Sequence, residues 1–370
     1  MWLGRGYGGA PDPTNPANEV CFGTWAGIQN CWILRAYSKL DFAYVRQACA
    51  VEDWWRNPAD GQVYPCMLLV FSAYSNYRGQ EDLYMARLDP RVLGHPAYSP
   101  MANSALIPFP RRREVLKPDP KFRVVTAGGQ IAFQVFRAKH PAWVAPAKGS
   151  LRPLVYVDGN LLTTANYILD RARGRLVYKH PSTGRIVLVI DPASGTVTFS
   201  QPLPASHKVE VEYSPTVYRI TDDPAPDFAP VAVNDKAYTR DATGTLVPDW
   251  RLWIFWNRRD PVTGKTSVFV QTIHHYREDP NDPNDDAWDF TWLREAPPKD
   301  LQPGPLPIRA APGEGRVAVA VHLEPQSNPH GNLGVWPGKL LRLFIVWPSI
   351  RSGNGDLYWC AYLPKIEPGL

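Results

Sequence analysis

Three segments of this chain share one pattern, and an internal repeat constrains a fold more strongly than any single motif. Each segment begins with an apolar and aromatic run, continues through a polar turn that contains Arg and Gly, and ends in a second run with alternating apolar positions. Alternation with a period of two is typical of a β-strand, so each segment predicts a β-hairpin. The segments are LLVFSAYSNYRGQEDLYMARL at 68–88, LWIFWNRRDPVTGKTSVFVQTI at 252–273 and RLFIVWPSIRSGNGDLYWCAYL at 342–363.

The turns of the hairpins carry equivalent residues. These are Arg78, Arg258 and Arg351, together with Gly79, Gly264 and Gly355. A hairpin of this kind is half of a four-stranded sheet, and such sheets arranged radially form a β-propeller that leaves only short edges. Further strands are predicted at 31–45 and at 317–323. We therefore expect an all-β fold with a β-propeller, and the alternative is that three amphipathic hairpins look alike without being blades.

Residues 151–214 have a different sequence pattern from the three hairpins. Their short apolar runs are separated, at intervals of about ten residues, by turn signals in which Gly supplies the positive φ. Proline-rich segments on both sides are typical of linkers. The predicted organisation is first propeller blades at 1–145, an inserted small β-sandwich or meander module at 151–214, and the remaining blades at 229–370. Two β-domains in tandem are the alternative.

Composition supports an all-β chain and disfavours other classes. Of 370 residues, 39 are Pro, 14 are Trp and only 4 are Met, a balance that disfavours long helices and hints at a thermophilic source. A net charge of +5 gives no whole-molecule field directed at nucleic acid. No apolar run approaches the roughly 20 residues that span a bilayer, and the N-terminal segment lacks the apolar core of a signal peptide.

The region between the two linkers also carries a specific order of residues. A strand ends in Asp158-Gly159, a Tyr-x-x-Asp strand follows at 167–170, Gly195 makes a turn, a strand leads from Phe199 to Pro202, and Val alternates with Glu over 209–213. This order resembles the small β-rich repeats of phage tail fibres and other virion appendage proteins. The resemblance implies a virion or extracellular location, with other subunits of a virion or filament as partners.

The first hairpin, with the two residues after it, reads LLVFSAYSNYRGQEDLYMARLDP. It is similar to a blade of sialidase-like or five-bladed glycosidase propellers, which implies a glycan as ligand. The Asp-box motif Ser-x-Asp-x-Gly-x-Thr-Trp of sialidase turns does not occur. The segment DPVTGKT at 260–266 has the residue types of that motif but not its spacing.

Glycoside hydrolysis requires two carboxylates, one as acid and one as base or nucleophile. The candidates in or beside predicted strands are Asp41, Asp53, Asp249 and Asp356. Carboxylates in such positions commonly cap turns or charge sheet edges. We therefore expect no catalytic residues and predict that the chain is not an enzyme, with a glycoside hydrolase as the runner-up.

The tryptophans divide into two sets. Trp253, Trp256, Trp347 and Trp359 alternate with aliphatic residues, as expected where one blade packs on the next. The second set lies in Pro-, Asn- and Asp-rich segments that we predict to be exposed loops, in contact with another subunit or a sugar. With the turn arginines, which either clamp an anion or stay solvated, the predicted interface or ligand-binding residues are Trp54, Trp55, Trp288, Trp292, Trp336, Arg78, Arg258 and Arg351.

The sequence has no strong metal or disulfide signature. Its five cysteines include no CxxC pair and are predicted to be mainly small apolar core residues. No cofactor is expected, although Ca2+ at Asp279, Asp282 and Asp285 is an alternative to a solvated acidic loop. The pair His274-His275 lacks a third ligand and is predicted to lie at the surface.

Two functions from different classes follow. The favoured one is a structural or adhesive component of a large assembly, a phage tail or virion protein that acts through protein–protein contacts as a homo-oligomer. The alternative is an extracellular carbohydrate-active propeller, either a glycosidase or a lectin. Neither function involves nucleic acid or insertion into a membrane.

Overall fold

The computed structural model describes residues 2–5, 20–23, 32–33, 42–57, 60–89, 106–143, 152–162, 167–170, 175–235, 238–240, 244, 246–276, 286–289, 318–325, 339–349 and 355–362. These residues form antiparallel strands and one short 3-10 helix, η4 (Pro120–Phe122). The predicted all-β fold is therefore confirmed.

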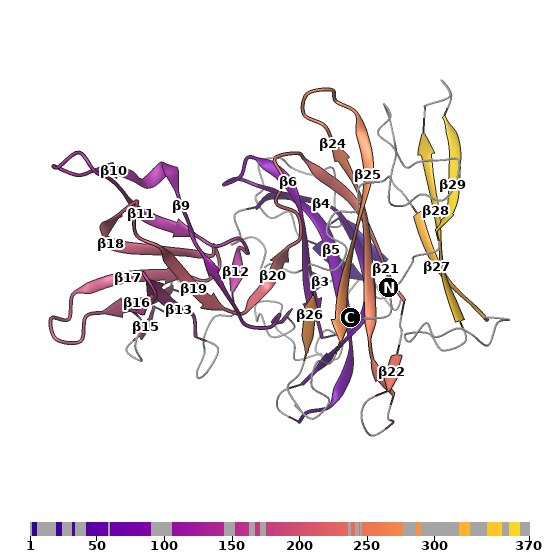
Figure 1. The fold of residues 1–370 in the computed structure, drawn as a ribbon, viewed down its shortest axis with the longest axis horizontal. Coiled ribbons are helices and arrows are strands. Elements are labelled where there is room, and N and C mark those ends of the chain that lie inside the picture. The colour runs from indigo at the N-terminus through magenta and orange to yellow at the C-terminus, as the bar shows by residue number, and fades with distance from the viewer. Residues whose placement is uncertain are drawn as a thin grey trace.

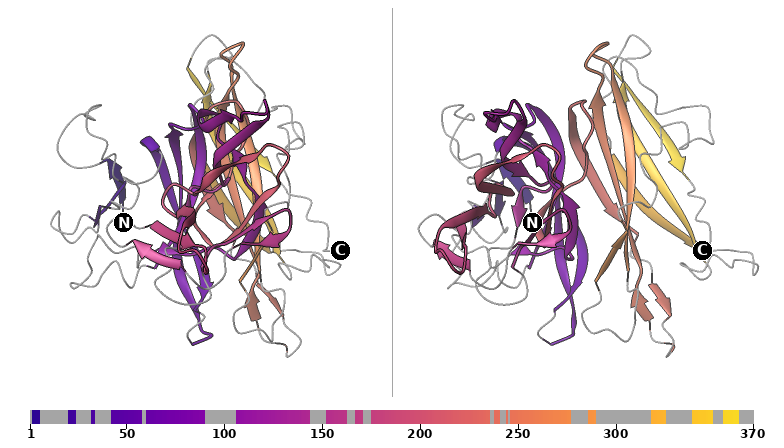
Figure 2. Two further views of the ribbon diagram at one scale, coloured as in Figure 1. Left: turned by 90° about the vertical axis from the view of Figure 1, so that its left-hand side faces the viewer. Right: turned by 60° about the vertical axis from the view of Figure 1, so that its left-hand side comes forward.

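Three sheets lie side by side as layers in the part of the molecule opposite the β-sandwich (Figures 1 and 2). Sheet 1 contains β4 (Phe42–Arg56), β5 (Val63–Ser75), β6 (Gln80–Leu88), β20 (Pro215–Arg219) and β12 (Ala142–Trp143), and β7 (Leu106–Ile107) also pairs with β6. Sheet 2 contains β21 (Asp227–Asn234), β24 (Trp250–Arg259), β25 (Thr266–Tyr276) and β26 (Ala287–Asp289). Sheet 3 contains β27 (Ala318–Pro325), β28 (Lys339–Ser349) and β29 (Asp356–Tyr362).

Two small sheets accompany the layers. A three-stranded sheet near the N-terminus contains β1 (Trp2–Arg5), β2 (Val20–Gly23) and β3 (Trp32–Ile33). A short pair is formed by β22 (Tyr238–Arg240) and β23 (Leu246–Pro248), which lie between β21 and β24 in the chain.

The three predicted hairpins are confirmed as β5–β6, β24–β25 and β28–β29. The turn glycines Gly79 and Gly264 have φ of +69° and +68°, the left-handed region in which Gly has no steric penalty. In the second hairpin, Asp260 Oδ1 accepts hydrogen bonds from the backbone N–H groups of Val262 and Thr263. The Asp and Gly of this turn thus fix the register of β24 on β25.

The core between sheets 1 and 2 explains why the strands are apolar without interruption. Leu68, Val70, Leu83 and Met85 of sheet 1 belong to one buried cluster with Leu252, Ile254, Trp256 and Ile273 of sheet 2. The intervening residues Leu69, Phe71, Trp253 and Phe255 are buried as well, on the opposite faces of the two sheets. A sheet covered on both sides requires apolar residues at every position, which is the pattern of these hairpins.

The first strands of successive layers lie next to one another. β21 lies against β4 on one side and against β27 on the other, and β1 lies against β4. No closed ring of blades is seen among the described residues, so the predicted propeller is not confirmed.

A β-sandwich packs at one end of sheet 1 (Figure 1). Its larger sheet contains β9 (Lys117–Pro118), β10 (Arg123–Val125), β11 (Ile131–Arg137), β15 (Tyr167–Asp170), β16 (Arg175–Lys179), β17 (Ile186–Asp191) and β18 (Thr196–Pro204). Its smaller sheet contains β8 (Arg112–Val115), β13 (Leu154–Val157), β14 (Asn160–Leu161) and β19 (Val209–Tyr213). Alternating residues of both sheets, among them Phe136, Val155, Leu188 and Val211, form its buried core.

The sandwich includes strands that precede residue 151. β8 and β11 pair with β19 and β18 of the predicted 151–214 module, and β9 and β10 pair with β11, so its sheets begin near Arg112. The chain leaves sheet 1 after β7, visits it again at β12 while it builds the sandwich, and finally returns to pair with β6 through β20. Strand β8 pairs with β19, so the connection that precedes β8 and the connection that follows β19 lie side by side.

Candidate functional site

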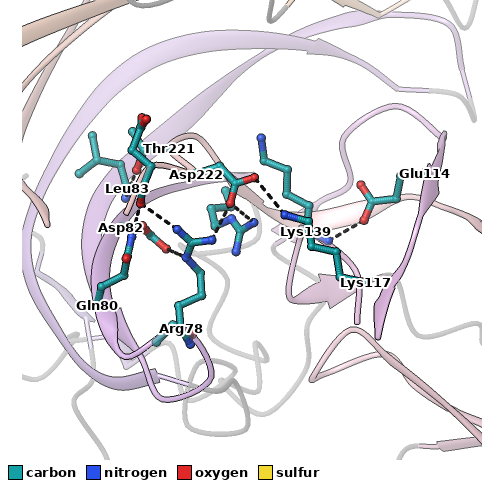
Figure 3. A network of polar contacts seen from close by, with 12 residues as sticks. Arg78, Gln80, Asp82, Leu83, Glu114, Lys117, Lys139, Thr221 and Asp222 are labelled. Atoms are coloured by element: carbon teal, nitrogen blue, oxygen red, sulfur yellow. Dashed lines mark hydrogen bonds and ion pairs between the residues drawn. The ribbon is translucent and has the colours of Figure 1, made fainter. Parts of the chain in front are cut away.

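A pocket of about 720 Å3 lies where the sandwich meets sheet 1. One wall comes from β8, β9 and β11 of the sandwich, and the other comes from the β5–β6 turn and the segment 219–224 that follows β20. Figure 3 shows that charged side chains from both walls approach one another across this junction. The pocket therefore exists only because the sandwich docks on the sheet.

A network of ion pairs fixes the sheet side of the pocket (Figure 3). Asp222 Oδ1 lies 2.6 Å from Arg78 Nη1 and 2.6 Å from Arg219 Nη2. Arg78 Nε lies 2.7 Å from Asp82, whose carboxylate also accepts a hydrogen bond from Gln80. Burial raises the pKa of Asp82 to about 6, although Arg78 acts in the opposite direction.

The sandwich side is fixed in the same way. Asp119 Oδ2 lies 2.7 Å from Arg137 Nε, and the Arg137 guanidinium lies over the Tyr77 ring from the opposite wall. Glu114 accepts a hydrogen bond from the backbone N–H of Lys139 and lies 3.6 Å from Arg112 Nε. The walls of the pocket are thus held by pairs in which each guanidinium faces a carboxylate.

Positive charge is in excess in the pocket. Seven basic side chains line it, whereas the carboxylates of the lining and of its supports are Asp82, Glu114, Asp119 and Asp222. The four carboxylates balance the charges of the four arginines, so the excess positive charge equals that of the three lysines. The Lys117 ammonium lies 3.9 Å from Asp222, which already pairs with two arginines. Burial lowers the pKa of Lys139, and the nearby guanidinium groups of Arg219 and Arg112 lower it further, although Asp222 opposes them.

Of the three turn arginines, the structure describes two, and it brings them to one segment. Arg78 Nη2 donates to the carbonyl oxygen of Asp223, and Arg258 Nη2 lies 2.6 Å from the Asp223 carboxylate. Arg258 also binds the buried carboxylate of Asp227. The prediction of solvated turn arginines is therefore wrong for both, and the proline-rich segment after β20 is anchored rather than a free linker. Arg351 lies outside the described residues.

Two of the predicted interface tryptophans meet inside the molecule. The rings of Trp54 and Trp288 each stack on the imidazole of His275, at centroid distances of 3.9 and 4.0 Å. His275 Nδ1 lies 2.9 Å from Asp53 Oδ1, and its Nε2 lies 2.6 Å from Asp286 Oδ1. We call these five residues the His275 cluster; it joins sheet 1 to sheet 2.

The His275 cluster corrects two expectations. His275 is buried, so it does not belong to a surface pair, and Trp54 is 2% exposed in strand β4 rather than in a loop. Burial lowers the pKa of His275, but the Asp53 and Asp286 carboxylates outweigh it and the pKa is raised. Trp55, also in β4, is partly exposed beside Tyr64. Trp292 and Trp336 lie outside the described residues.

The exposed aromatic surface lies elsewhere, on sheet 3. Along β28, Leu343, Ile345 and Trp347 are fully buried, while the alternate residues Val346 and Pro348 are exposed. Across the strand pair, Trp359 lies opposite Val346 and Leu357 lies opposite Pro348. Trp359 is 63% exposed and Leu357 is 75% exposed. We call these four residues the outer face of sheet 3.

This face was missed from the sequence because Trp359 alternates with aliphatic residues as a buried residue would. Trp253, Trp256 and Trp347 do lie in the core as predicted, but the prediction for Trp359 is wrong. The available signal was the register of the hairpin, since cross-strand partners of Val346 and Pro348 must share their face.

Of the candidate catalytic carboxylates that the structure describes, Asp53 and Asp249 do not form a pair at one site. Asp53 contacts His275 and Asp249 contacts His274, and these adjacent residues of β25 point to opposite faces of the sheet. Asp356 lies at the start of β29, and Asp41 lies outside the described residues. Asp279, Asp282 and Asp285 also lie outside them. The part of the chain that is described holds no group of three potential metal ligands and no helix long and apolar enough to cross a bilayer.

Comparisons with protein-family models, with curated proteins and with solved structures each give no match for this chain. The resemblances to virion appendage modules and to sialidase-like propellers therefore stay predictions.

Proposed function

We propose that this chain is a structural component of a multi-subunit assembly, of the kind found in phage tails and other virion appendages. It acts through protein–protein contacts rather than through catalysis, and its layered sheets serve as blades of a propeller-like array. The contact we propose is between the outer face of sheet 3 and a second copy of the chain. The observation that carries this proposal is the exposure of paired apolar side chains on that face.

The pairing distinguishes this face from scattered surface residues. Single exposed apolar side chains are normal, but a contiguous apolar patch marks an interaction site. Here Trp359 and Val346, and Leu357 and Pro348, are direct cross-strand neighbours, so the four side chains form one continuous surface. Trp is also the residue that most often anchors an interface.

The layered packing indicates what covers this surface. Sheets 1 and 2 bury their apolar faces against each other, and sheet 3 continues the same series of layers (Figure 1). Leu357 and Trp359 are exposed on the outer face of sheet 3. We therefore expect a further sheet of the same kind to pack on the outer face of sheet 3. A second copy of the chain provides such a sheet, so assembly repeats between copies the sheet-on-sheet packing that is present within one chain.

Oligomeric state tests the proposal. We expect sedimentation velocity at micromolar concentration to show a dimer or larger species for the wild type and a monomer for a Leu357→Glu, Trp359→Glu double variant. The control is Val262→Glu, which places the same charge on an apolar residue that is 90% exposed in the β24–β25 turn; it should leave the oligomer unchanged. Losing one central Trp costs an interface about 2 kcal/mol or more.

A monomeric wild type would refute the proposal, as would an oligomer that survives the double variant. Quenching of Trp359 fluorescence by a quencher in solution distinguishes a third outcome, in which the protein is monomeric but Trp359 is covered. If the wild type is monomeric but Trp359 is shielded, another part of the same chain covers the face, and the proposed contact between copies is wrong.

A further inference from the structure

We propose that the pocket between the sandwich and sheet 1 binds a small multivalent anion, a ligand that carries a phosphate or sulfate group. This site is independent of the outer face of sheet 3, which lies on a different sheet. It does not rest on the proposed assembly function, and neither experiment decides the other.

The size and position of the pocket suit a small molecule. Ligand pockets commonly have volumes of roughly 300–1,000 Å3 and occur preferentially where two domains meet. This pocket has about 720 Å3, and the sandwich and sheet 1 each supply one wall. Its ion pairs hold both walls in place, so binding requires little rearrangement.

The charge distribution separates residues that build the pocket from residues that bind. Arg78, Arg137 and Arg219 each hold a carboxylate at 2.6 or 2.7 Å and so stabilise the junction. Lys121 and Lys139 line the same space, and no hydrogen bond or ion pair of their ammonium groups is seen within the described part of the chain. The lysines are therefore the groups available to a ligand.

Burial is the main cause of the lowered pKa of Lys139. Arg219 and Arg112 lower this pKa further, whereas Asp222 and Glu114 act in the opposite direction. An anion placed beside Lys139 stabilises the charged ammonium group. Bound anion and charged Lys139 stabilise each other, so binding is accompanied by proton uptake wherever Lys139 is partly deprotonated in the free protein.

The number of uncompensated charges points to the class of ligand. A single carboxylate carries one negative charge, whereas the three lysines give an excess of three positive charges. Lysine ammonium groups act as compact point charges with three donors each, which suits the several oxygens of a phosphate or sulfate group. The wall carboxylates Glu114 and Asp222 can accept hydrogen bonds from hydroxyl groups attached to such a ligand.

Isothermal titration calorimetry with inorganic pyrophosphate tests the proposal on the full chain. We expect saturable binding to one site, weakened by about tenfold in Lys139→Gln and by about a further tenfold in the double variant Lys117→Gln, Lys139→Gln, because each substitution removes a charge-assisted hydrogen bond. The control Lys265→Gln removes the same charge from the exposed β24–β25 turn and should change affinity by less than about twofold. Acetate, a monovalent anion, should bind far more weakly than pyrophosphate.

Proton uptake on binding distinguishes an anion bound beside Lys139 from nonspecific charge attraction. At a pH where Lys139 is partly deprotonated in the free protein, titrations in buffers of different ionisation enthalpy should show protons taken up by the wild type on binding and a smaller uptake by Lys139→Gln. Parallel titrations with phosphate and sulfate distinguish the two ligand chemistries. The proposal is overturned if pyrophosphate shows no saturable binding, or if the pocket variants bind as tightly as Lys265→Gln.

Discussion

Replacing His275 by Gln tests the joint between sheets 1 and 2 most directly. The imidazole is 1% exposed and bonds two carboxylates, Asp53 at 2.9 Å and Asp286 at 2.6 Å. Asp286 keeps a second cation in the variant, since Arg87 Nη1 lies 2.7 Å from its other oxygen. Asp53 is left buried beside a neutral amide.

The expected cost follows from these contacts. Removing one member of a buried ion pair typically costs about 3–5 kcal/mol. The ring contacts with Trp54 and Trp288 add about 1 kcal/mol each, and one hydrogen bond that Gln can re-form returns about 1 kcal/mol. We expect the free energy of unfolding to fall by about 5 kcal/mol, measured by urea denaturation followed by Trp fluorescence. His274→Gln is the control, because His274 lies on the same strand but is bound to Asp249 nearer the surface.

The pH dependence of unfolding provides the second measurement. The folded-state pKa of His275 is raised above 6.5, so its stabilising contribution is complete below pH 6.5 and is lost as the pH rises through the raised value. The pKa of Asp286 is lowered below 3.8: burial opposes this, but Arg87 and His275 outweigh it. Its contribution is complete above pH 3.8 and is lost as the pH falls. His275→Gln should remove the alkaline loss; an unchanged pH profile, or a cost below about 1 kcal/mol, would refute the reasoning.

Two further predictions concern the backbone. Gly195→Ala should destabilise the protein by about 2 kcal/mol or more, because φ is +63° and the new Cβ would lie 2.8 Å from the carbonyl oxygen of His140. The control is Gly159→Ala, which should cost about 1 kcal/mol, because φ is +82° but the space around the new Cβ is open. Thermal denaturation compares the stabilities of the two variants. Segment 222–228 should resist subtilisin in the native protein because Arg78, Arg219 and Arg258 bind its carboxylates and backbone, and Arg258→Ala should expose it. Rapid native-state cleavage there, or equal melting temperatures of the glycine variants, would contradict these expectations.

The sequence predicts local elements well because their signals are local. The hairpins at 68–88 and 252–273 follow from alternation and from turn residues such as Asp260 and Gly264, whose hydrogen bonds span only a few residues. Trp54 and Trp55 were assigned to a loop because polar turn residues follow them directly. They lie at the end of a long strand, and the turn begins only at Asn57.

The site residues depend on pairings that no local pattern encodes. His275 contacts Asp53, which lies on a strand of another sheet. Trp359 lies on the exposed face of the β28–β29 pair because the register of the strands places it opposite Val346. The start of the sandwich was placed too late for a similar reason. β8 and β9 are short, charged and interrupted by proline, and they become strands by pairing with β19 and β11.

The return of the chain to β6 through β20 determines the order in which the molecule can assemble. Ala86 leaves the ribosome long before Val217, its partner in sheet 1, so the pairing of β6 with β20 must wait until the whole sandwich has been synthesised. The pairing of Arg112 with Tyr213 brings the two connections together once the sandwich has folded. A folded sandwich thereby turns a very long loop closure into a short one, which saves about 2 kcal/mol of chain entropy when β20 docks. We therefore expect the folded sandwich to speed the docking of β20, and mutations in its core to delay completion of sheet 1 even where they leave that sheet untouched.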